Sequence, residues 1–343
     1  MKTSRLAMVG FGNVGQGMLQ IMRDRSESLA ERFGVRFTVV AVNDMRMGSL
    51  YHSAGLDYQA LLDAATAGDL TTVPAEHYGW SVQTMLEQAE ADTLIEASFT
   101  DLNTGEPALS YIRQALRSGK HVVTTNKGPI ALAFPELQSL ARTNHVHIGY
   151  EGTVMSGTPA LALGRNLLVA AGIQRIQGIL NGTTNFILTR MEAGESYAQA
   201  LAEAQALGYA EADPTGDVEG YDTAGKVVIL SSLVMDAKLS LAEVDRQGIT
   251  HLTPHDIQQA QREGKRWKLI GTLERVNGKV VARVRPTPVS LQHPLASVSG
   301  AMNAITYSTD LLGEVTLIGP GAGRLETGTA LINDLLAIHS EIP

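Results

Sequence analysis

The chain has 343 residues, 44% of them hydrophobic and 18% charged, which is the composition of a globular protein too long for one small core. Its formal net charge of -8 argues against nucleic acid and against an anionic membrane surface as partners. The lack of cysteine excludes disulfides, thiolate metal sites and cysteine nucleophiles. Because the chain is too long for one small core, we expect two domains.

The N-terminus shows no targeting segment. It runs from a short basic start directly into an apolar strand and a glycine turn, without the long apolar stretch of a signal peptide. No uninterrupted apolar run approaches the roughly 18 residues needed to cross a bilayer. These features favour a cytoplasmic enzyme.

The first elements form a strand, a glycine turn, a helix and a second strand. The strands are expected at residues 5–9 and 37–42, with the helix at residues 13–31 and Val14, Met18, Ile21 and Met22 on its buried face. The turn reads GFGNVG and is the GxGxxG pattern of a Rossmann dinucleotide-binding unit, in which the helix N-terminus receives the pyrophosphate. Glycine turns are common, so the prediction of dinucleotide binding depends on the two strands that flank this one. The expected cofactor contacts are Gly10, Phe11, Gly12, Asn13, Val14 and Gly15.

The second strand ends beside two residues that point to different cofactors. Asp44 favours a free ribose 2′-hydroxyl and hence NAD, whereas Arg46 favours the 2′-phosphate of NADP. The sequence leaves this choice open.

Further strands alternate with a helix and predict a mostly parallel sheet. Strands are expected at residues 93–97 and 121–125, with a helix at residues 111–118 between them. The second of these strands leads into Asn126, Lys127, Gly128 and Pro129, which we interpret as a rigid turn. Lys127 is either an exposed loop lysine or a functional group at the carboxyl edge of the sheet, where ligands bind.

The sequence changes character after residue 150. A loop of small residues (YEGTVMSGTP) precedes a helix, a strand at residues 176–180 and the polar segment NGTTN, in which Asn181 or Thr183 is expected to cap a helix starting near Asn185. Residues 279–290 and 315–318 have strand patterns. The second is followed by a glycine turn and a helix at residues 327–338, which suggests that the chain returns to the nucleotide-binding domain.

An acidic cluster at residues 208–226 ends in a lysine. Charge runs of this kind are usually solvated loops, but glycines interrupt this one and the apolar segment VVILSSLVM follows it. Asp222 and Lys226 are spaced i, i+4, which is worth only about 0.3 to 0.5 kcal/mol for an exposed pair. On a helix that lines a cleft, the same pair positions a lysine for proton transfer. The acidic residues are Glu211, Asp213, Asp217, Glu219 and Asp222.

Together these motifs resemble the homoserine dehydrogenase family over nearly the whole chain. The matching blocks, in order, are GFGNVG, TTNKGPIA, YEGTVMSGTPAL, GILNGTTNFILTRM, ALGYAEADPTGDVEGYDTAGK and GPGAG. The resemblance implies reversible reduction of L-aspartate 4-semialdehyde to L-homoserine with NADPH or NADH, in threonine, methionine and isoleucine biosynthesis. It also implies a fold of the α/β class: a Rossmann domain (residues 1–150, completed by 305–343) with an inserted α+β substrate and dimerisation domain (residues 151–304).

Site roles carried over by the resemblance fall on matching residues of this sequence. Lys226 matches the acid/base lysine and Asp222 its partner, while Lys127 is a second candidate proton donor. Substrate contacts are expected from Glu211, Asp217, Asn181 and Thr183. Ser98 and Gly321 match further cofactor contacts. A sodium ion held mainly by backbone carbonyls is expected at Glu151, Val154, Ser156 and Thr158, although Met155 and Ser156 depart from the small residues common there.

Two alternatives and two family-based expectations complete the prediction. The alternatives are a related NAD(P)-dependent amino-acid dehydrogenase and a non-catalytic dinucleotide sensor. Phosphorylating oxidation of the semialdehyde needs a cysteine, which this chain lacks. The resemblance implies a homodimer, and it implies the short form of the enzyme, without a regulatory or aspartokinase domain and without threonine feedback through such a domain.

Overall fold

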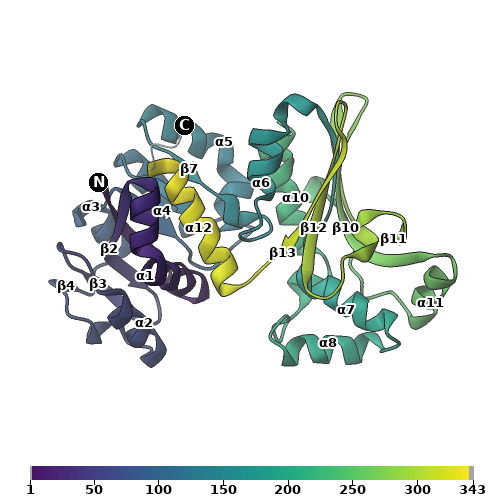
Figure 1. Cartoon of the computed structure of the whole chain (residues 1–343), viewed down its shortest axis with the longest axis horizontal. Coiled ribbons are helices and arrows are strands. Elements are labelled where there is room, and N and C mark those ends of the chain that lie inside the picture. The colour runs from purple at the N-terminus through teal and green to yellow at the C-terminus, as the bar shows by residue number, and fades with distance from the viewer. Residues whose placement is uncertain (1, 340–343) are drawn as a thin grey trace. The chain divides into compact units, whose positions relative to one another are not determined.

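The computed structural model describes residues 2–339, and the chain divides into two compact units (Figure 1). The first unit comprises Met1–Gly157 and Gly323–Pro343, and the second comprises Thr158–Ala322. The first unit is therefore built from both ends of the sequence.

The first unit contains a mostly parallel sheet, as predicted. Its strand order is β4-β3-β2-β1-β5-β6-β7. The five strands from β2 to β7 in this order run parallel, whereas β3 and β4 add an antiparallel edge that is not predicted from the sequence. The strands are β1 (Lys2–Val9), β2 (Val35–Asp44), β3 (Gly48–Tyr51), β4 (His77–Tyr78), β5 (Thr93–Glu96), β6 (His121–Thr124) and β7 (Ile148–Gly149).

Two helices from opposite ends of the sequence lie side by side in this unit (Figure 1). A Cβ atom on Gly17 of α1 would lie 2.0 Å from the carbonyl oxygen of Arg324, and one on Gly328 of α12 would lie 2.5 Å from the nitrogen of Met18. Glycine at both positions therefore allows the two backbones to approach closely. The helices of the unit are α1 (Asn13–Phe33), α2 (Tyr58–Ala67), α3 (Val82–Gln88), α4 (Ala108–Arg117), α5 (Lys127–Thr143) and α12 (Arg324–His339), with short helical turns η1 (Leu70–Thr72) and η2 (Glu151–Thr153).

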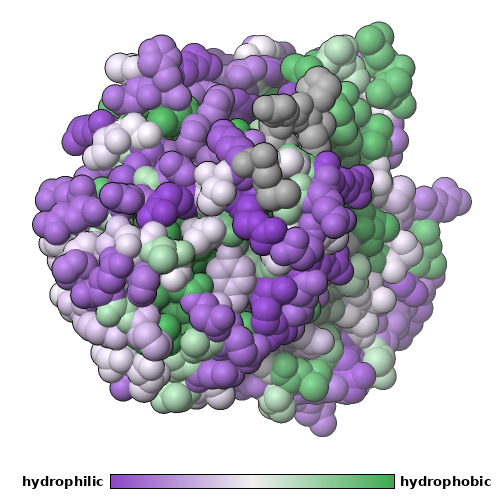
Figure 2. All heavy atoms as spheres, turned by 60° about the vertical axis from the view of Figure 1, so that its left-hand side comes forward, coloured by the Kyte–Doolittle hydropathy of each residue, from purple (hydrophilic) through white to green (hydrophobic). Residues whose placement is uncertain are grey.

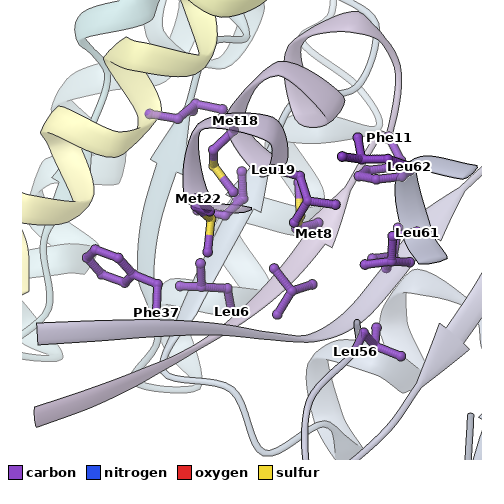
Figure 3. Packing of buried hydrophobic residues seen from close by; sticks show 14 of the residues in the cluster. Leu6, Met8, Phe11, Met18, Leu19, Met22, Phe37, Leu56, Leu61 and Leu62 are labelled. Atoms are coloured by element: carbon purple, nitrogen blue, oxygen red, sulfur yellow. The ribbon is translucent and has the colours of Figure 1, made fainter. Parts of the chain in front are cut away.

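The core of the first unit forms where α1 covers the sheet (Figure 3). Met18 and Met22 on the predicted face of α1 are buried, and Val14 and Ile21 are partly buried at its margin. Each fully buried side chain of this size contributes about 1.5–3 kcal/mol relative to an exposed one. This packing fixes the glycine turn at the start of α1 on the end of β1.

The second unit contains a mainly antiparallel sheet with helices. Its strand order is β13-β12-β8-β10-β11-β9, and the pair β11–β9 is parallel. The strands are β8 (Ile173–Ile179), β9 (Asp245–Arg246), β10 (Lys265–Val276), β11 (Lys279–Ser290), β12 (Met302–Thr309) and β13 (Gly313–Pro320). The helices are α6 (Ala160–Ala162), α7 (Gly182–Glu192), α8 (Tyr197–Ala206), α9 (Thr215–Val218), α10 (Tyr221–Val234) and α11 (Pro254–Arg262), with short turns η3 (Leu163–Leu167), η4 (Val169–Ala171), η5 (Leu241–Glu243) and η6 (Pro294–Ser297).

The boundary between the units differs from the expected one. Residues 305–322 were expected in the nucleotide-binding domain, but they lie in the second unit, and the first unit extends to Gly157. The reason is strand pairing, because β12 hydrogen-bonds to both β8 and β13 and so belongs to the second sheet. Only the helix α12 returns to the first unit, as predicted for residues 327–338.

The face shown in Figure 2 is mainly hydrophilic, and its hydrophobic side chains gather mostly toward the upper right of the view. Among the described residues, no helix is long and apolar enough to span a membrane.

Candidate functional site

The glycine turn of the first unit leaves room for a ligand at its centre. Gly10 has φ 84°, and a Cβ there would lie 2.5 Å from the carbonyl oxygen of Ala97. A Cβ on Gly15 would lie 2.9 Å from the carbonyl oxygen of Gly10, whereas one on Gly12 would meet nothing within 4 Å. The outer glycines thus serve the turn and the packing of the helix, and Gly12 leaves open space where a pyrophosphate can approach the backbone.

The start of α1 has the properties of a phosphate site. Its N-cap is Gly12, which provides no side-chain hydrogen bond, and its first turn has no acidic residue. The first-turn N–H groups therefore carry the partial positive charge of the helix N-terminus without a competing side-chain cap. Asn13 is exposed and Val14 half-buried at this end, while the side chain of Phe11 is buried, so that Phe11 offers only its backbone.

Asp44 connects the end of β2 to the glycine turn. Its Oδ2 accepts a hydrogen bond from the backbone N–H of Phe11 at 2.8 Å, and its Oδ1 accepts from the N–H groups of Arg46 at 2.9 Å and Met47 at 3.2 Å. A carboxylate has about four acceptor sites, so these three bonds leave capacity for a ribose hydroxyl. The side chain of Arg46 is exposed beside it.

Ser98 and Lys127 follow neighbouring parallel strands, β5 and β6. The N–H of Ser98 donates to Glu96 Oε1 at 3.0 Å. Lys127 is half-buried and is the first residue of α5, whose N-cap Asn126 accepts from the N–H of Gly128 at 3.2 Å. The predicted rigid turn at residues 126–129 is therefore the capped first turn of a helix. Because the carboxyl ends of parallel strands share one edge of a sheet, both residues lie at the ligand-binding edge.

In the second unit, Lys226 lies at the centre of a buried polar network. It is on α10, as the apolar segment predicted, and is 7% exposed. Its Nζ donates to Asp222 Oδ2 at 2.7 Å and to the carbonyl oxygen of Leu180 at 2.6 Å. The ion pair is shielded from water, with side-chain exposures of 9% and 18%, and so differs from a solvated surface pair.

Asn181 joins two carboxylates to this network. Its Nδ2 donates to Asp217 Oδ1 at 2.7 Å and to Asp222 Oδ2 at 3.0 Å. Its Oδ1 accepts from the N–H of Thr184 at 2.9 Å, which makes Asn181 the N-cap of α7. Of the two predicted caps, Asn181 is confirmed. Thr183 lies inside the first turn, and its hydroxyl donates to the carbonyl oxygen of Tyr209 at 2.6 Å.

Two causes raise the pKa of Asp217. Burial is the larger, and the negative charge of Asp222 is the second, while the hydrogen bond from Asn181 opposes both. A buried carboxyl group with a raised pKa, beside a second carboxylate and a buried lysine, is typical of functional sites.

The other acidic residues of the cluster lie outside this network. Glu211 is exposed, and its backbone oxygen accepts a hydrogen bond from Gln205 Nε2 at 3.1 Å. Asp213 accepts from the N–H of Thr215 at 3.1 Å, and Glu219 accepts from the hydroxyl of Thr250 at 2.8 Å. Thus only Asp217 and Asp222 are brought to Lys226.

Gly321 lies in the turn after β13, beside the buried side chain of Asn303. A Cβ at Gly321 would lie 2.1 Å from Asn303 Cγ, so only glycine fits. Asn303 was not singled out from the sequence, because its burial depends on the pairing of β12 with β13.

The loop proposed for sodium is held by side-chain hydroxyl groups. Ser156 Oγ lies 2.7 Å from Thr327 Oγ1, and Thr158 Oγ1 donates to the carbonyl oxygen of Pro320 at 2.9 Å. Val154 is fully buried, and its N–H donates to the carbonyl of Glu151 at 3.3 Å. Within residues 2–339, no group of three or more His, Asp or Glu side chains is arranged to hold a metal ion.

Family models match both parts of the chain. The model described as homoserine dehydrogenase matches residues 159–336, and the one described as the NAD-binding domain of homoserine dehydrogenase matches residues 10–151.

Relatives match over nearly the full length. The NAD(+)-dependent homoserine dehydrogenase of Pseudomonas canavaninivorans is 47% identical, with 98% of this chain and 96% of the relative covered. The crystal structure of a homoserine dehydrogenase from Thiobacillus denitrificans superposes with a TM-score of 0.86 at 32% identity, covering 100% of this chain and 76% of that one. A mutant of a hyperthermophilic archaeal homoserine dehydrogenase in complex with NADPH gives a TM-score of 0.86 at 31% identity, with 99% of each chain covered. The chain therefore belongs to the homoserine dehydrogenase family of NAD(P)-dependent oxidoreductases, which act on a CH–OH group.

Proposed function

We propose that the network around Lys226 binds L-homoserine and that Lys226 Nζ exchanges a proton with the hydroxyl group of this substrate. The observation that carries this proposal is the buried ammonium group, which is held by Asp222 and by the carbonyl of Leu180. An ammonium group has three N–H donors, and these two bonds leave one for a substrate oxygen.

The chemistry follows from where charge develops. When bound, the nicotinamide would supply a hydride acceptor for the alcohol carbon and a hydride donor for the aldehyde carbon. In the reduction direction, Lys226 stabilises the developing alkoxide and then protonates it. An oriented charged donor of this kind is worth several kcal/mol in a site that excludes water. Asp222 holds the ammonium group in its direction, and Asn181 holds Asp222 in place.

Other members of the site are proposed from their positions. Asp217 and Thr183 lie beside Asn181 and suit the polar ends of an amino acid, and Glu211 is exposed at the end of the same segment. Lys127 is a second candidate proton donor, supported by its place at the ligand-binding edge of the parallel sheet.

For the cofactor, we propose NAD as the preferred dinucleotide. Two observations support this choice: Asp44 presents a carboxylate at the end of β2, and the relative with 47% identity is named NAD(+)-dependent. A 2′-phosphate beside that carboxylate would suffer charge repulsion. The exposed Arg46 is the residue that would oppose this preference.

A sodium site at residues 151–158 also remains a proposal. The hydroxyl groups of Ser156 and Thr158 already have partners, so the ligands would be backbone carbonyls. Met155 and Ser156 both have left-handed backbone, with φ 60° and 56°, which reorients consecutive carbonyl groups. Initial rates in sodium and in choline chloride at equal ionic strength test this proposal, and equal rates would contradict it.

A homodimer is proposed on the basis of an apolar patch in the second unit. Leu167, Val169, Leu311 and Leu312 are 74%, 70%, 77% and 62% exposed, and the N–H of Leu311 donates to the carbonyl of Ala171 at 3.2 Å. Exposed apolar patches of this kind mark contact surfaces. Sedimentation equilibrium of the wild type and of Leu311→Lys tests this, and a wild-type monomer would contradict it.

The cytoplasmic location stays a prediction that cell fractionation tests.

The first test of function is the initial rate with L-homoserine at matched concentrations of NAD and NADP. We expect turnover with both and a higher rate with NAD. Lys226→Ala should lower kcat by about 10²-fold or more, as loss of general acid–base catalysis does. The exposed Lys279→Ala is the matched control and should leave kcat unchanged. Binding of NADH without turnover of L-homoserine would instead favour a dinucleotide sensor or a related amino-acid dehydrogenase.

A further inference from the structure

Glu96 is a buried carboxyl group to which the proposed mechanism gives no role. It is the last residue of β5, and its side chain is 0% exposed. A buried carboxyl group is costly unless hydrogen bonds satisfy its oxygens. Its hydrogen bonds come from two segments, the loop after β5 and the end of β6.

Each oxygen of Glu96 holds one segment. Oε1 accepts from the N–H of Ser98 at 3.0 Å and also contacts the Ser98 hydroxyl. Oε2 accepts from the hydroxyl of Thr124 at 3.1 Å. Ser98 begins the loop after β5, and Thr124 is the last residue of β6. One carboxyl group therefore connects the ends of two neighbouring parallel strands.

The connection continues to the start of α5. Thr124 Oγ1 accepts from the N–H of Asn126 at 3.0 Å, so its own hydrogen is directed at Glu96. Asn126 Nδ2 donates to the carbonyl of Phe99 at 2.8 Å, and its Oδ1 caps α5, whose first residue is Lys127. Glu96 thus connects by hydrogen bonds to Ser98 directly and to the first residue of α5, Lys127, through Thr124 and Asn126.

We propose that Glu96 is a positioning residue, which holds the Ser98 loop and the first turn of α5 in the arrangement that binds the dinucleotide and places Lys127. The inference rests on the proposed function of these two segments. Its physical basis is that a buried acceptor serving several donors cannot be removed without leaving the N–H of Ser98 and the hydroxyl of Thr124 unsatisfied. Both segments would then shift toward other partners.

Gln is the informative conservative replacement. Burial raises the pKa of Glu96, and the hydrogen bonds from Ser98 and Thr124 oppose that shift. Gln has the same size and carries no charge; its Oε1 keeps an acceptor for Ser98, and its Nε2 can donate to Thr124 Oγ1 in place of accepting from it. Ala removes both acceptors. The comparison of Glu96→Gln with Glu96→Ala therefore separates the effect of losing the hydrogen bonds from the effect of losing the negative charge.

Thr93→Val is the matched control. Thr93 is buried at the opposite end of the same strand, where its hydroxyl lies 2.8 Å from His339 Nε2. Its replacement removes a buried hydrogen bond from β5 without touching Ser98 or α5. This variant should lower the melting temperature while leaving cofactor binding and kcat as in the wild type.

The experiment measures NADH dissociation by nicotinamide fluorescence in the absence of substrate, and then kcat and KM for L-homoserine. Misplacement of catalytic groups by about 1 Å costs up to about 100-fold in rate, so Glu96→Ala is expected to lower kcat by about that factor. We expect it to weaken NADH binding as well and to leave KM for L-homoserine nearly unchanged. Glu96→Gln should restore most of both losses.

Two outcomes would overturn the inference: Glu96→Ala matching Thr93→Val in NADH affinity and kcat, or Glu96→Gln being as impaired as Glu96→Ala. Should Glu96→Ala fail to fold, Thr124→Val breaks the link to α5 while retaining Glu96, and normal kcat in that variant would likewise overturn it. If the wild type does not oxidise L-homoserine, the proposed function fails, but the comparison of NADH affinities still decides the role of Glu96.

Discussion

Asp222 Oδ2 accepts hydrogen bonds from both Lys226 Nζ, at 2.7 Å, and Asn181 Nδ2, at 3.0 Å. The first partner lies one helical turn away on α10, and the second caps α7. Asp222 therefore connects the start of one helix to a buried lysine on another, and it sets the direction of the ammonium group.

Replacing Asp222 by Asn tests this relationship. Asn keeps an oxygen that accepts from Lys226 but removes the negative charge, so we expect kcat to fall by about 10²-fold, the size of a general acid–base contribution. The affinity for NADH, measured by fluorescence, should stay within about twofold of the wild-type value, because the glycine turn proposed to bind the dinucleotide belongs to the first unit and Asp222 to the second. Asp245→Asn removes an exposed ion pair with Arg285 in the same unit and is the control. A near-normal kcat in Asp222→Asn would remove Asp222 from the mechanism.

The preference for NAD should depend on Asp44. Asp44→Asn keeps one acceptor oxygen, for the N–H group of either Phe11 or Arg46, while removing the charge that repels a 2′-phosphate. The ratio of kcat/KM for NADP to that for NAD is expected to rise about tenfold, which corresponds to about 1.4 kcal/mol. Asp69→Asn, which alters an exposed turn carboxylate of the same unit, should leave the ratio unchanged. An unchanged ratio in Asp44→Asn would show that another group selects the cofactor.

Close packing of α1 and α12 should make Gly328 intolerant of a side chain. A methyl group there would lie 2.5 Å from the backbone nitrogen of Met18, which cannot move without displacing α1. Gly328→Ala is expected to lower the free energy of unfolding by about 1–3 kcal/mol, as overpacking does. Urea denaturation measures this change. The neighbouring Thr329→Ala is exposed and should change stability by less than about 0.5 kcal/mol. Equal stability of the two variants would refute the packing argument.

Stability should fall in acid through His339. Its Nε2 lies 2.8 Å from Thr93 Oγ1 and 3.2 Å from Ser4 Oγ, and burial, followed by the nearby His121, lowers its pKa to about 4. Because the folded-state pKa lies below the unfolded value of about 6.5, the folded state resists protonation. The contribution of His339 is therefore complete above about pH 6.5 and is lost as the pH falls toward 4.

His339→Gln removes this titration. We expect the free energy of unfolding of the variant to change less between pH 7.5 and 5 than that of the wild type, as measured by urea denaturation at each pH. The exposed His251→Gln should retain the wild-type pH dependence. Identical pH dependence in His339→Gln and the wild type would contradict the assignment.

The sequence by itself determined the features that depend on local spacing. The GxGxxG turn, the face of α1 with Met18 and Met22, and the i, i+4 pair of Asp222 and Lys226 are all set by residues close together in the chain. Helical and strand periodicity carry this information directly. The same holds for the family, because its motifs are short and contiguous.

Tertiary structure alone decided which distant groups meet. Asp217 and Glu211 look equivalent in the sequence, but only Asp217 reaches Asn181. Glu96 appears as one charged residue in an apolar strand, and its link to Thr124 depends on β5 lying beside β6. Residues 305–322 read as a return to the first unit until β12 is seen to pair with β8. In each case the deciding contact is a hydrogen bond across many residues of sequence, and such pairings are set by the packing of whole elements and not by local spacing.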